Sequence, residues 1–219
     1  MFTANTSFFS RLILRALGIR VIRRGKHALG GQNSLIVSNH VSYVDILVIA
    51  SLRPAVFITS VELKRTFPLG MFARFGGSIF VERRNPAGLK REIRDIEQAL
   101  RDGHSVVLFP EGTTFDGATV RPFKNSLFTA ALRTETPVLP LCIRYLRANG
   151  KRLHAGNKDA VYYHGGTTFM EHVPRLLALR SVHVECRFLD PIAAQPDLDR
   201  KGLATRCHEV IKAAYHAGK

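Results

Sequence analysis

The alternation of short apolar runs with helical patterns is the feature that most constrains the fold of this 219-residue chain. The runs are of β type, and the patterns between them are typical of amphipathic helices. The predicted strands are residues 35–38, 55–59, 78–81, 105–109, 138–145 and 182–188. The predicted helices are residues 46–52, 125–133 and 169–179, one that follows Asn85-Pro86 and ends near Gly103, and one that begins at Asp199. This order predicts an α/β fold with a central, largely parallel sheet flanked by helices. Residues 144–163, rich in Gly, Lys and Asn, are expected to be an excursion within the domain.

Composition supports one folded domain with a sizeable core, because hydrophobic residues make up 46% of the chain. The three cysteines, Cys142, Cys186 and Cys207, lie among apolar neighbours and lack CxxC spacing. They are expected to be buried and reduced, and no metal site is predicted.

The net charge of +15, from 32 Lys and Arg against 17 Asp and Glu, predicts attraction to an anionic partner. Nucleic acid, acidic lipid headgroups, polyphosphate cofactors and acidic carrier proteins all satisfy that condition. The basic residues are spread along the chain, and the spacing of no nucleic-acid-binding module is recognisable, so no nucleic-acid partner is expected.

The N-terminal segment is both basic and apolar. Over residues 7–17, Phe8, Leu12 and Ala16 share one helical stripe, and Arg11 and Arg15 lie off it. Charges interrupt the run too often for a transmembrane helix. We therefore expect residues 1–26 to be an amphipathic membrane-association segment on an anionic surface, and residues 27–219 to be the catalytic domain. The alternative is a helix that simply packs on the domain.

Polar groups follow consecutive predicted strands, where active sites of parallel sheets collect. His40 and Asp45 follow the first strand, Arg83 and Arg84 follow 78–81, and Glu111 follows 105–109. Gly112 and Thr113 come next, and Lys124 opens a later helix. A histidine oriented by a carboxylate is a general base for an alcohol, and the cations suggest an adjacent anion site. No GxSxG elbow is present, and no cysteine is close to His40, which argues against an acyl-enzyme.

Each of these residues also has a simpler interpretation. Ser42 and Asp45 form a good capping pair for the helix that follows, and His40 alone could be a turn histidine. Arg83 could be a solvated charge at a strand end, and Glu111-Gly112 an ordinary turn. Asp116-Gly117 is expected to be a turn.

Four blocks of the sequence together resemble the glycerolipid acyltransferase superfamily. Asn39-His40-x-x-x-x-Asp45 matches its signature block, and the stretch from Gly77 to Arg83 is similar to the second. The stretch from Phe109 to Thr113 is similar to the third, and Val138-Leu139-Pro140-Leu141 to the fourth. The resemblance covers residues 30–192 and implies a glycerol-3-phosphate acyltransferase-like fold.

The resemblance also implies roles for individual residues. His40 would deprotonate the acceptor hydroxyl, and Asp45 would orient it. Arg83 would bind the acceptor's anionic head, with Lys124 as a further cation, and Pro140 would border the donor site. The residues that would shape the acceptor site are Glu111, Gly112 and Thr113. The donor would be acyl-CoA or an acyl-carrier protein, used as co-substrate without any cofactor.

The expected activity is O-acyl transfer from an acyl thioester to a lysolipid, and the acceptor expected before any other is 1-acylglycerol-3-phosphate, which would give phosphatidate. Thr114 stands where many phosphate-acceptor enzymes have arginine, and FPEGTTFDG resembles the lyso-ornithine-lipid branch, which gives the alternative acceptor. From other classes, a non-catalytic basic binding protein and a lipid esterase that activates water stay open. The expected location is the cytoplasmic face of the inner membrane, as a peripheral or monotopic protein.

Overall fold

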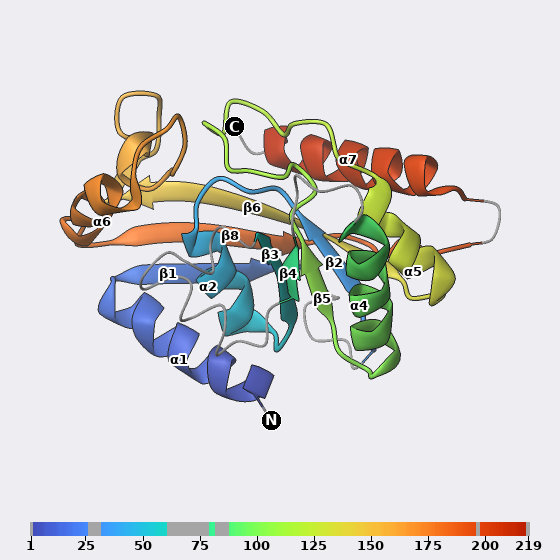
Figure 1. The fold of residues 1–219 in the computed structure, drawn as a ribbon. Helices are drawn as coiled ribbons and strands as arrows, with labels where there is room; N and C mark the ends of the chain where they lie inside the picture. Colours follow the sequence, from blue (N-terminus) through green and yellow to red (C-terminus); the bar gives the residue numbers. More distant parts are fainter. Residues whose placement is uncertain (1, 26–31, 61–78, 82–87, 196–197, 218–219) are drawn as a thin grey trace.

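The computed structural model describes residues 2–25, 32–60, 79–81, 88–195 and 198–217 (Figure 1). The helices are α1 (Phe2–Ala16), α2 (Val44–Leu52), α4 (Leu89–Arg101), α5 (Thr129–Arg133), α6 (Phe169–Leu177) and α7 (Arg200–His216), with short 3-10 turns η4 (Ser126–Phe128) and η5 (Lys158–Ala160). The strands are β1 (Ile19–Arg24), β2 (Leu35–Ser38), β3 (Val56–Ser60), β4 (Ile79–Val81), β5 (Val106–Leu108), β6 (Val138–Ala148), β7 (Lys151–Arg152) and β8 (Val182–Phe188).

The described strands form one sheet in the order β1-β8-β6-β2-β5-β3-β4, with β7 paired to β6. The strands from β6 to β4 run parallel to one another, and β8 is antiparallel to β6. The predicted α/β class with a largely parallel sheet is confirmed. Because β2, β5 and β6 are parallel neighbours, the segments that follow β2 and β5 emerge at the same edge of the sheet.

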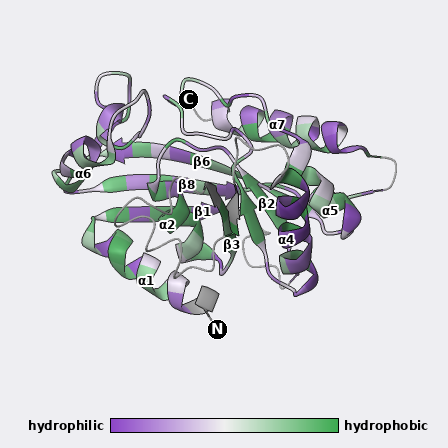
Figure 2. Ribbon diagram, in the orientation of Figure 1, coloured by the Kyte–Doolittle hydropathy of each residue, from purple (hydrophilic) through white to green (hydrophobic). Residues whose placement is uncertain are grey.

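Helices cover both faces of the sheet, since alternate strand residues point to opposite sides. In β2, Ile36 joins the core beneath α1, α2 and α6, while Leu35 and Val37 join the core beneath α4, α5 and α7. Figure 1 shows α1 and α2 on one side of the sheet and α7 on the other. The central strands are largely hydrophobic and the outer side of α4 is hydrophilic, as expected for a buried parallel sheet (Figure 2).

Some boundaries differ from the predictions. Strand β6 continues to Ala148, so residues 146–148, predicted only as part of the excursion, belong to the sheet. Residues 125–133 divide into η4 and α5. The cysteines are buried and free, as predicted.

The N-terminal segment contains two structures rather than one. Helix α1 ends at Ala16, and residues 19–24 form β1, which pairs in parallel with β8 at the edge of the sheet. Helix α1 packs on α2 through Ser7, Ser10 and Leu14, which are buried. The predicted apolar stripe faces outward, because Phe8 and Leu12 are 58% and 49% exposed. No helix in the described ranges combines the length and the apolar character that crossing a bilayer would need.

Candidate active site

The chain beyond β2 is tied to β6 by the side chain of Asn39. Its Nδ2 donates to the Ile143 carbonyl at 2.9 Å, and its Oδ1 accepts from the Ile143 N–H at 2.8 Å. The side-chain amide therefore replaces a backbone pair just where β2 has ended, and it is 1% exposed. Because His40 is the next residue, its position is set by the register of β2 against β6.

His40 and Asp45 form the hydrogen-bonded pair that the sequence predicted. Nδ1 of His40 lies 2.9 Å from Oδ2 of Asp45. The same oxygen accepts the backbone N–H groups of Val41 at 2.8 Å and Ser42 at 3.0 Å. Asp45 is fully buried, so these donors fix the direction of its carboxylate. In the neutral ring, a proton on Nδ1 leaves the lone pair on Nε2.

The capping interpretation of Ser42 and Asp45 holds only in part. Helix α2 begins at Val44, and Tyr43 occupies the N-cap position without a side-chain cap bond. The backbone N–H of Ser42 does reach the Asp45 carboxylate, but the backbone N–H of Asp45 bonds to the Ser42 carbonyl and not to its hydroxyl. A reciprocal capping box is therefore absent at this helix start. The bond to His40 is an interaction that capping alone would not require.

Tyr145 completes the surroundings of Asp45, and sequence reasoning did not find it. Its hydroxyl donates to Oδ1 of Asp45 at 2.7 Å, from strand β6. Burial, and next the negative charge of Asp45, raise the pKa of Tyr145 well above its ordinary value, so the phenol stays protonated and remains a donor. Each oxygen of the carboxylate thus has a donor of its own.

The ring of His40 is held on its face as well as at its edge. It stacks on Phe109 with the ring centroids 4.0 Å apart and the planes 19° from parallel. The backbone carbonyl of His40 accepts the N–H of Phe115. Within the described part of the chain, Nε2 makes no hydrogen bond, and the side chain is 13% exposed. The imidazole is fixed, with Nε2 as its unengaged nitrogen.

Glu111 joins the segment after β5 to the histidine. Its Oε1 accepts the backbone N–H of His40 at 2.8 Å, and its Oε2 accepts that of Arg121 at 2.9 Å. Burial raises the pKa of Glu111 to about 7, although both backbone bonds and the Arg121 charge oppose that rise. Glu111 is therefore more than a turn residue, because it fixes His40 and the 111–121 loop together. Its predicted contact with the acceptor stays a prediction.

Gly112 and Lys124 lie together beside Glu111. Gly112 has φ +82°, and a Cβ added there would lie 2.9 Å from Nζ of Lys124. The backbone N–H of Lys124 bonds to the Pro110 carbonyl, which brings this lysine back to the segment after β5. Thr113 and Lys124 are exposed. The structure thus places a cation next to the third block.

The remaining predicted residues lie elsewhere. Pro140 is buried within β6, in register with Val37 of β2, so it lies inside the sheet rather than at its edge. Arg83, Arg84 and most of the second block lie outside the described residues. The predicted turn at Asp116-Gly117 is present, since Gly117 has φ +68° and Asp116 accepts the N–H of Ala118.

The arrangement suits proton abstraction from an alcohol. A rigid imidazole with its lone-pair nitrogen unengaged, supported by a buried carboxylate, has the geometry of a general base. The cysteines offer no nucleophile, because burial raises the pKa of Cys142, Cys186 and Cys207. Lys124 supplies positive charge beside Gly112, the residue after Glu111, whose carboxylate accepts the backbone N–H of His40.

Comparison with known proteins agrees with this chemistry. The acyltransferase family pattern matches residues 13–144. The lyso-ornithine lipid O-acyltransferase of Brucella abortus is 34% identical over 215 residues, which cover 94% of this chain and 80% of that protein. The 1-acyl-sn-glycerol-3-phosphate acyltransferase of Neisseria gonorrhoeae is 28% identical over 82% of this chain and 68% of its own.

The fold also has a solved counterpart. The crystal structure of the 1-acyl-sn-glycerophosphate acyltransferase PlsC from Thermotoga maritima superposes with a TM-score of 0.72 at 22% identity, over 98% of this chain and 78% of that one. The family pattern matches more than half of this chain, and the Brucella abortus relative is 34% identical over most of it, so this chain is a member of the acyltransferase family.

Proposed function

We propose that this acyltransferase esterifies the free hydroxyl of a lysolipid, with His40 as the general base. The observation that carries the proposal is the pair His40–Asp45, joined at 2.9 Å and leaving Nε2 unengaged. Nε2 takes the proton of the acceptor hydroxyl while its oxygen attacks the carbonyl carbon of an acyl thioester. The C–O ester bond forms, the C–S bond breaks, and the proton passes from the imidazolium to the leaving thiolate.

The donor in this proposal is acyl-CoA or an acyl-carrier protein. Both are strongly anionic, which accords with the net charge of +15. The proposed location is the cytoplasmic face of the inner membrane. Attachment to a membrane surface is supported by the outward apolar stripe of α1, since an acceptor with an acyl chain resides in a bilayer.

Two acceptors have comparable support. For 1-acylglycerol-3-phosphate, the supporting observation is the ammonium group of Lys124 against Gly112, the residue after Glu111. For lyso-ornithine lipid, one supporting observation is Thr114, which stands where many phosphate-acceptor enzymes have arginine. The other is that four relatives of 28–34% identity are named lyso-ornithine lipid O-acyltransferases.

The decisive experiment incubates the purified protein with labelled acyl-CoA or acyl-carrier protein and a panel of lysolipids, and identifies the products by mass. The panel contains 1-acylglycerol-3-phosphate, lyso-ornithine lipid and uncharged monoacylglycerol. Release of free fatty acid without a diacyl product would instead identify an esterase.

The base is tested with His40→Ala, which we expect to lose 10²–10⁴-fold in rate, on the order of the contribution of a general base. The matched control is His104→Ala, since His104 is exposed in the turn after α4. If both variants keep the wild-type rate, the assignment of His40 is wrong.

A further inference from the structure

A basic pocket lies beside α1, at the far end of α2 from His40. It has a volume of about 550 Å³ and is walled by α1, the last turn of α2, the start of β1 and the turn before β8. Its arginines are Arg11, Arg15, Arg20 and Arg180, and no acidic residue lines it among the described residues. Four cations around one hollow form a site for an anion, because their mutual repulsion is relieved when the anion binds.

The pocket arginines differ from the arginines at the far ends of β1 and β8. At the far end of β1, four residues beyond Arg20, Arg24 pairs with Glu185 at 3.6 Å, and its register partner Arg187 in β8 pairs with the same carboxylate at 3.2 Å. In the described ranges, none of the four pocket arginines has a carboxylate partner. Among the described residues, the four arginines of the pocket thus carry positive charge that no carboxylate neutralises.

The walls of the pocket are fixed by close backbone contacts. Gly18 has φ +65°, and a Cβ there would lie 2.4 Å from the Arg180 carbonyl, so only glycine permits this approach of β1 to the turn before β8. Nε of Arg11 donates to the Ser51 carbonyl at 2.8 Å, which fixes that guanidinium against the end of α2. The arginines therefore emerge from a rigid frame.

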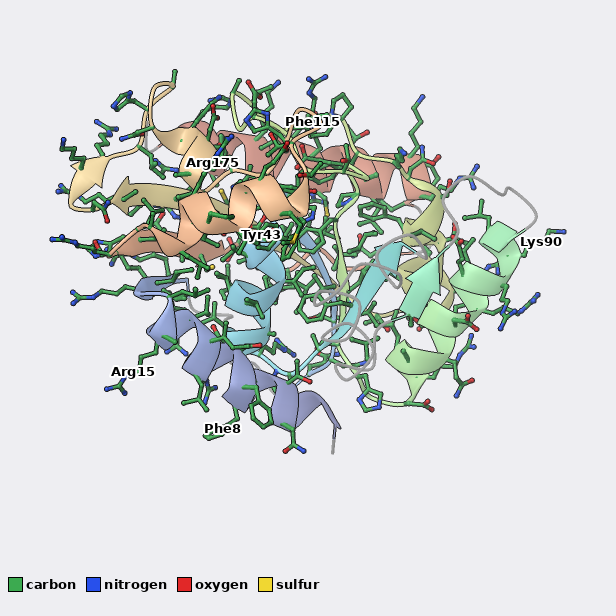
Figure 3. The ribbon with its side chains drawn as sticks, turned by 60° about the vertical axis from the view of Figure 1, so that its left-hand side comes forward. Phe8, Arg15, Tyr43, Lys90, Phe115 and Arg175 are labelled. Carbon is green, nitrogen blue, oxygen red and sulfur yellow. The ribbon has the colours of Figure 1, made fainter. Side chains whose placement is uncertain are left out.

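Apolar side chains adjoin the pocket on the same helix. Phe8, Phe9 and Leu12 are about half exposed on α1, and Figure 3 shows Phe8 and Arg15 both projecting from α1 away from the body of the protein. A ligand that satisfies both features has a phosphate next to hydrocarbon. Arginine is well matched to phosphate, because its fork of N–H donors binds two oxygens at once.

We propose that this pocket binds the phosphate of an anionic membrane phospholipid and thereby seats the Phe8–Leu12 stripe in the acyl layer. The proposal rests on the proposed function only in placing the enzyme at a membrane. A bilayer lipid fits better than the phosphates of the acyl donor, because the pocket shares no residue with the site around His40, where the thioester must react.

The test compares two variants that lose the same charge. The pocket variant is Arg15→Gln/Arg20→Gln/Arg180→Gln. The control is Arg94→Gln/Arg200→Gln/Arg206→Gln, on α4 and α7, which cover the opposite face of the sheet. Each carries Phe8→Trp as a reporter, since the chain has no tryptophan. Binding is measured by sedimentation and by the blue shift of the reporter's tryptophan emission on phosphatidylglycerol and phosphatidylcholine vesicles.

With phosphatidylglycerol, we expect the pocket variant to partition on the order of 100-fold more weakly, and the control to change less than about threefold. Equal losses in both variants would mean diffuse charge attraction and would overturn the proposal. So would unchanged binding of the pocket variant, or equal wild-type binding to both lipids. If thermal unfolding shows the triple variant to be destabilised, the double variant Arg20→Gln/Arg180→Gln is compared with Arg200→Gln/Arg206→Gln by the same criteria, with an expected loss of about 30-fold.

Acyl transfer in detergent micelles separates this proposal from the proposed function. Loss of transfer by the pocket variant in micelles, with a raised KM for the donor, would assign the pocket to the donor and overturn the proposal. If the wild type binds phosphatidylglycerol through the pocket but transfers no acyl chain, the enzyme assignment fails while the lipid site stands.

Discussion

Replacing Tyr145 by phenylalanine removes one oxygen from the support of Asp45 and nothing else. The side chain is 5% exposed, and its hydroxyl donates to Oδ1 of Asp45 at 2.7 Å. The other carboxylate oxygen keeps its bonds to His40, Val41 and Ser42. The variant therefore tests whether the direction and charge of the carboxylate matter to the base, without a change in the shape of the core.

The size of the effect follows from the kind of bond that is lost. A hydrogen bond to a charged group contributes about 1.5–3 kcal/mol, and its loss leaves Oδ1 buried without a partner. As the base takes a proton, His40 becomes positive, and a carboxylate that has turned away stabilises that charge less. If that loss appears in the transition state, kcat falls by about 10- to 150-fold, since each 1.36 kcal/mol is tenfold in rate. KM for the lysolipid should stay unchanged.

The matched control is Tyr162→Phe. Tyr162 is 8% exposed and contacts the ring of Tyr145 with centroids 5.9 Å apart, but the hydrogen-bond partner of its hydroxyl is Tyr215, and Asp45 acts on it only through its charge. Both variants should lower the free energy of unfolding, while only Tyr145→Phe should lower kcat. The reasoning is refuted if Tyr145→Phe unfolds more easily but keeps the kcat of the control.

Two further predictions concern the loop after β5. Because burial raises the pKa of Glu111 to about 7 from 4.5, the folded state binds this proton more tightly than the unfolded state, so the free energy of unfolding should fall by on the order of 3 kcal/mol from pH 4.5 to 7. In Glu111→Gln, denaturant titrations across that range should lack this slope; an unchanged slope contradicts the assignment. Gly112→Ala should cost about 1–3 kcal/mol of stability from its positive φ, and it should also raise KM for an anionic acceptor by displacing Lys124. Gly103→Ala is its control, since Gly103 has φ +79° with nothing within 4 Å of an added Cβ; equal KM values in the two variants would separate Lys124 from the acceptor.

The sheet was largely predictable because its strands are buried on both faces. The apolar run Leu35–Ser38 and the segment Val182–Phe188, in which apolar and polar residues alternate, are both typical of strands, and both were predicted at their observed bounds. Strand β1 was missed for the opposite reason. It is an edge strand, half exposed and rich in arginine, and such a strand resembles a basic surface segment.

In the active site, the contact between residues close in sequence was predicted, and the contacts between distant residues were not. His40 and Asp45 are five residues apart, so their spacing alone suggested the pair. Tyr145 bonds to Asp45, and Ile143 bonds to Asn39 next to His40, both from about a hundred residues away through the register of β6 against β2. One signal was available in the sequence. Leu141, Ile143 and Tyr145 occupy every second position of the predicted strand, so all three point to the face that α2 covers.

Helix α2 relates the two sites proposed for this chain. Its first turn carries Asp45, and its last turn, with Ser51 and Leu52, lines the arginine pocket. Nine residues of helix span about 13 Å, which is less than half of the ~30 Å hydrocarbon thickness of a bilayer. A phospholipid phosphate held in the pocket would therefore fix the base within reach of the headgroup layer, where the free hydroxyl of a lysolipid lies. The helix would then serve as a spacer, so that lengthening it by a turn should separate membrane binding from acyl transfer: the protein would still bind phosphatidylglycerol vesicles but would acylate lysolipid within them more slowly than lysolipid dispersed in detergent.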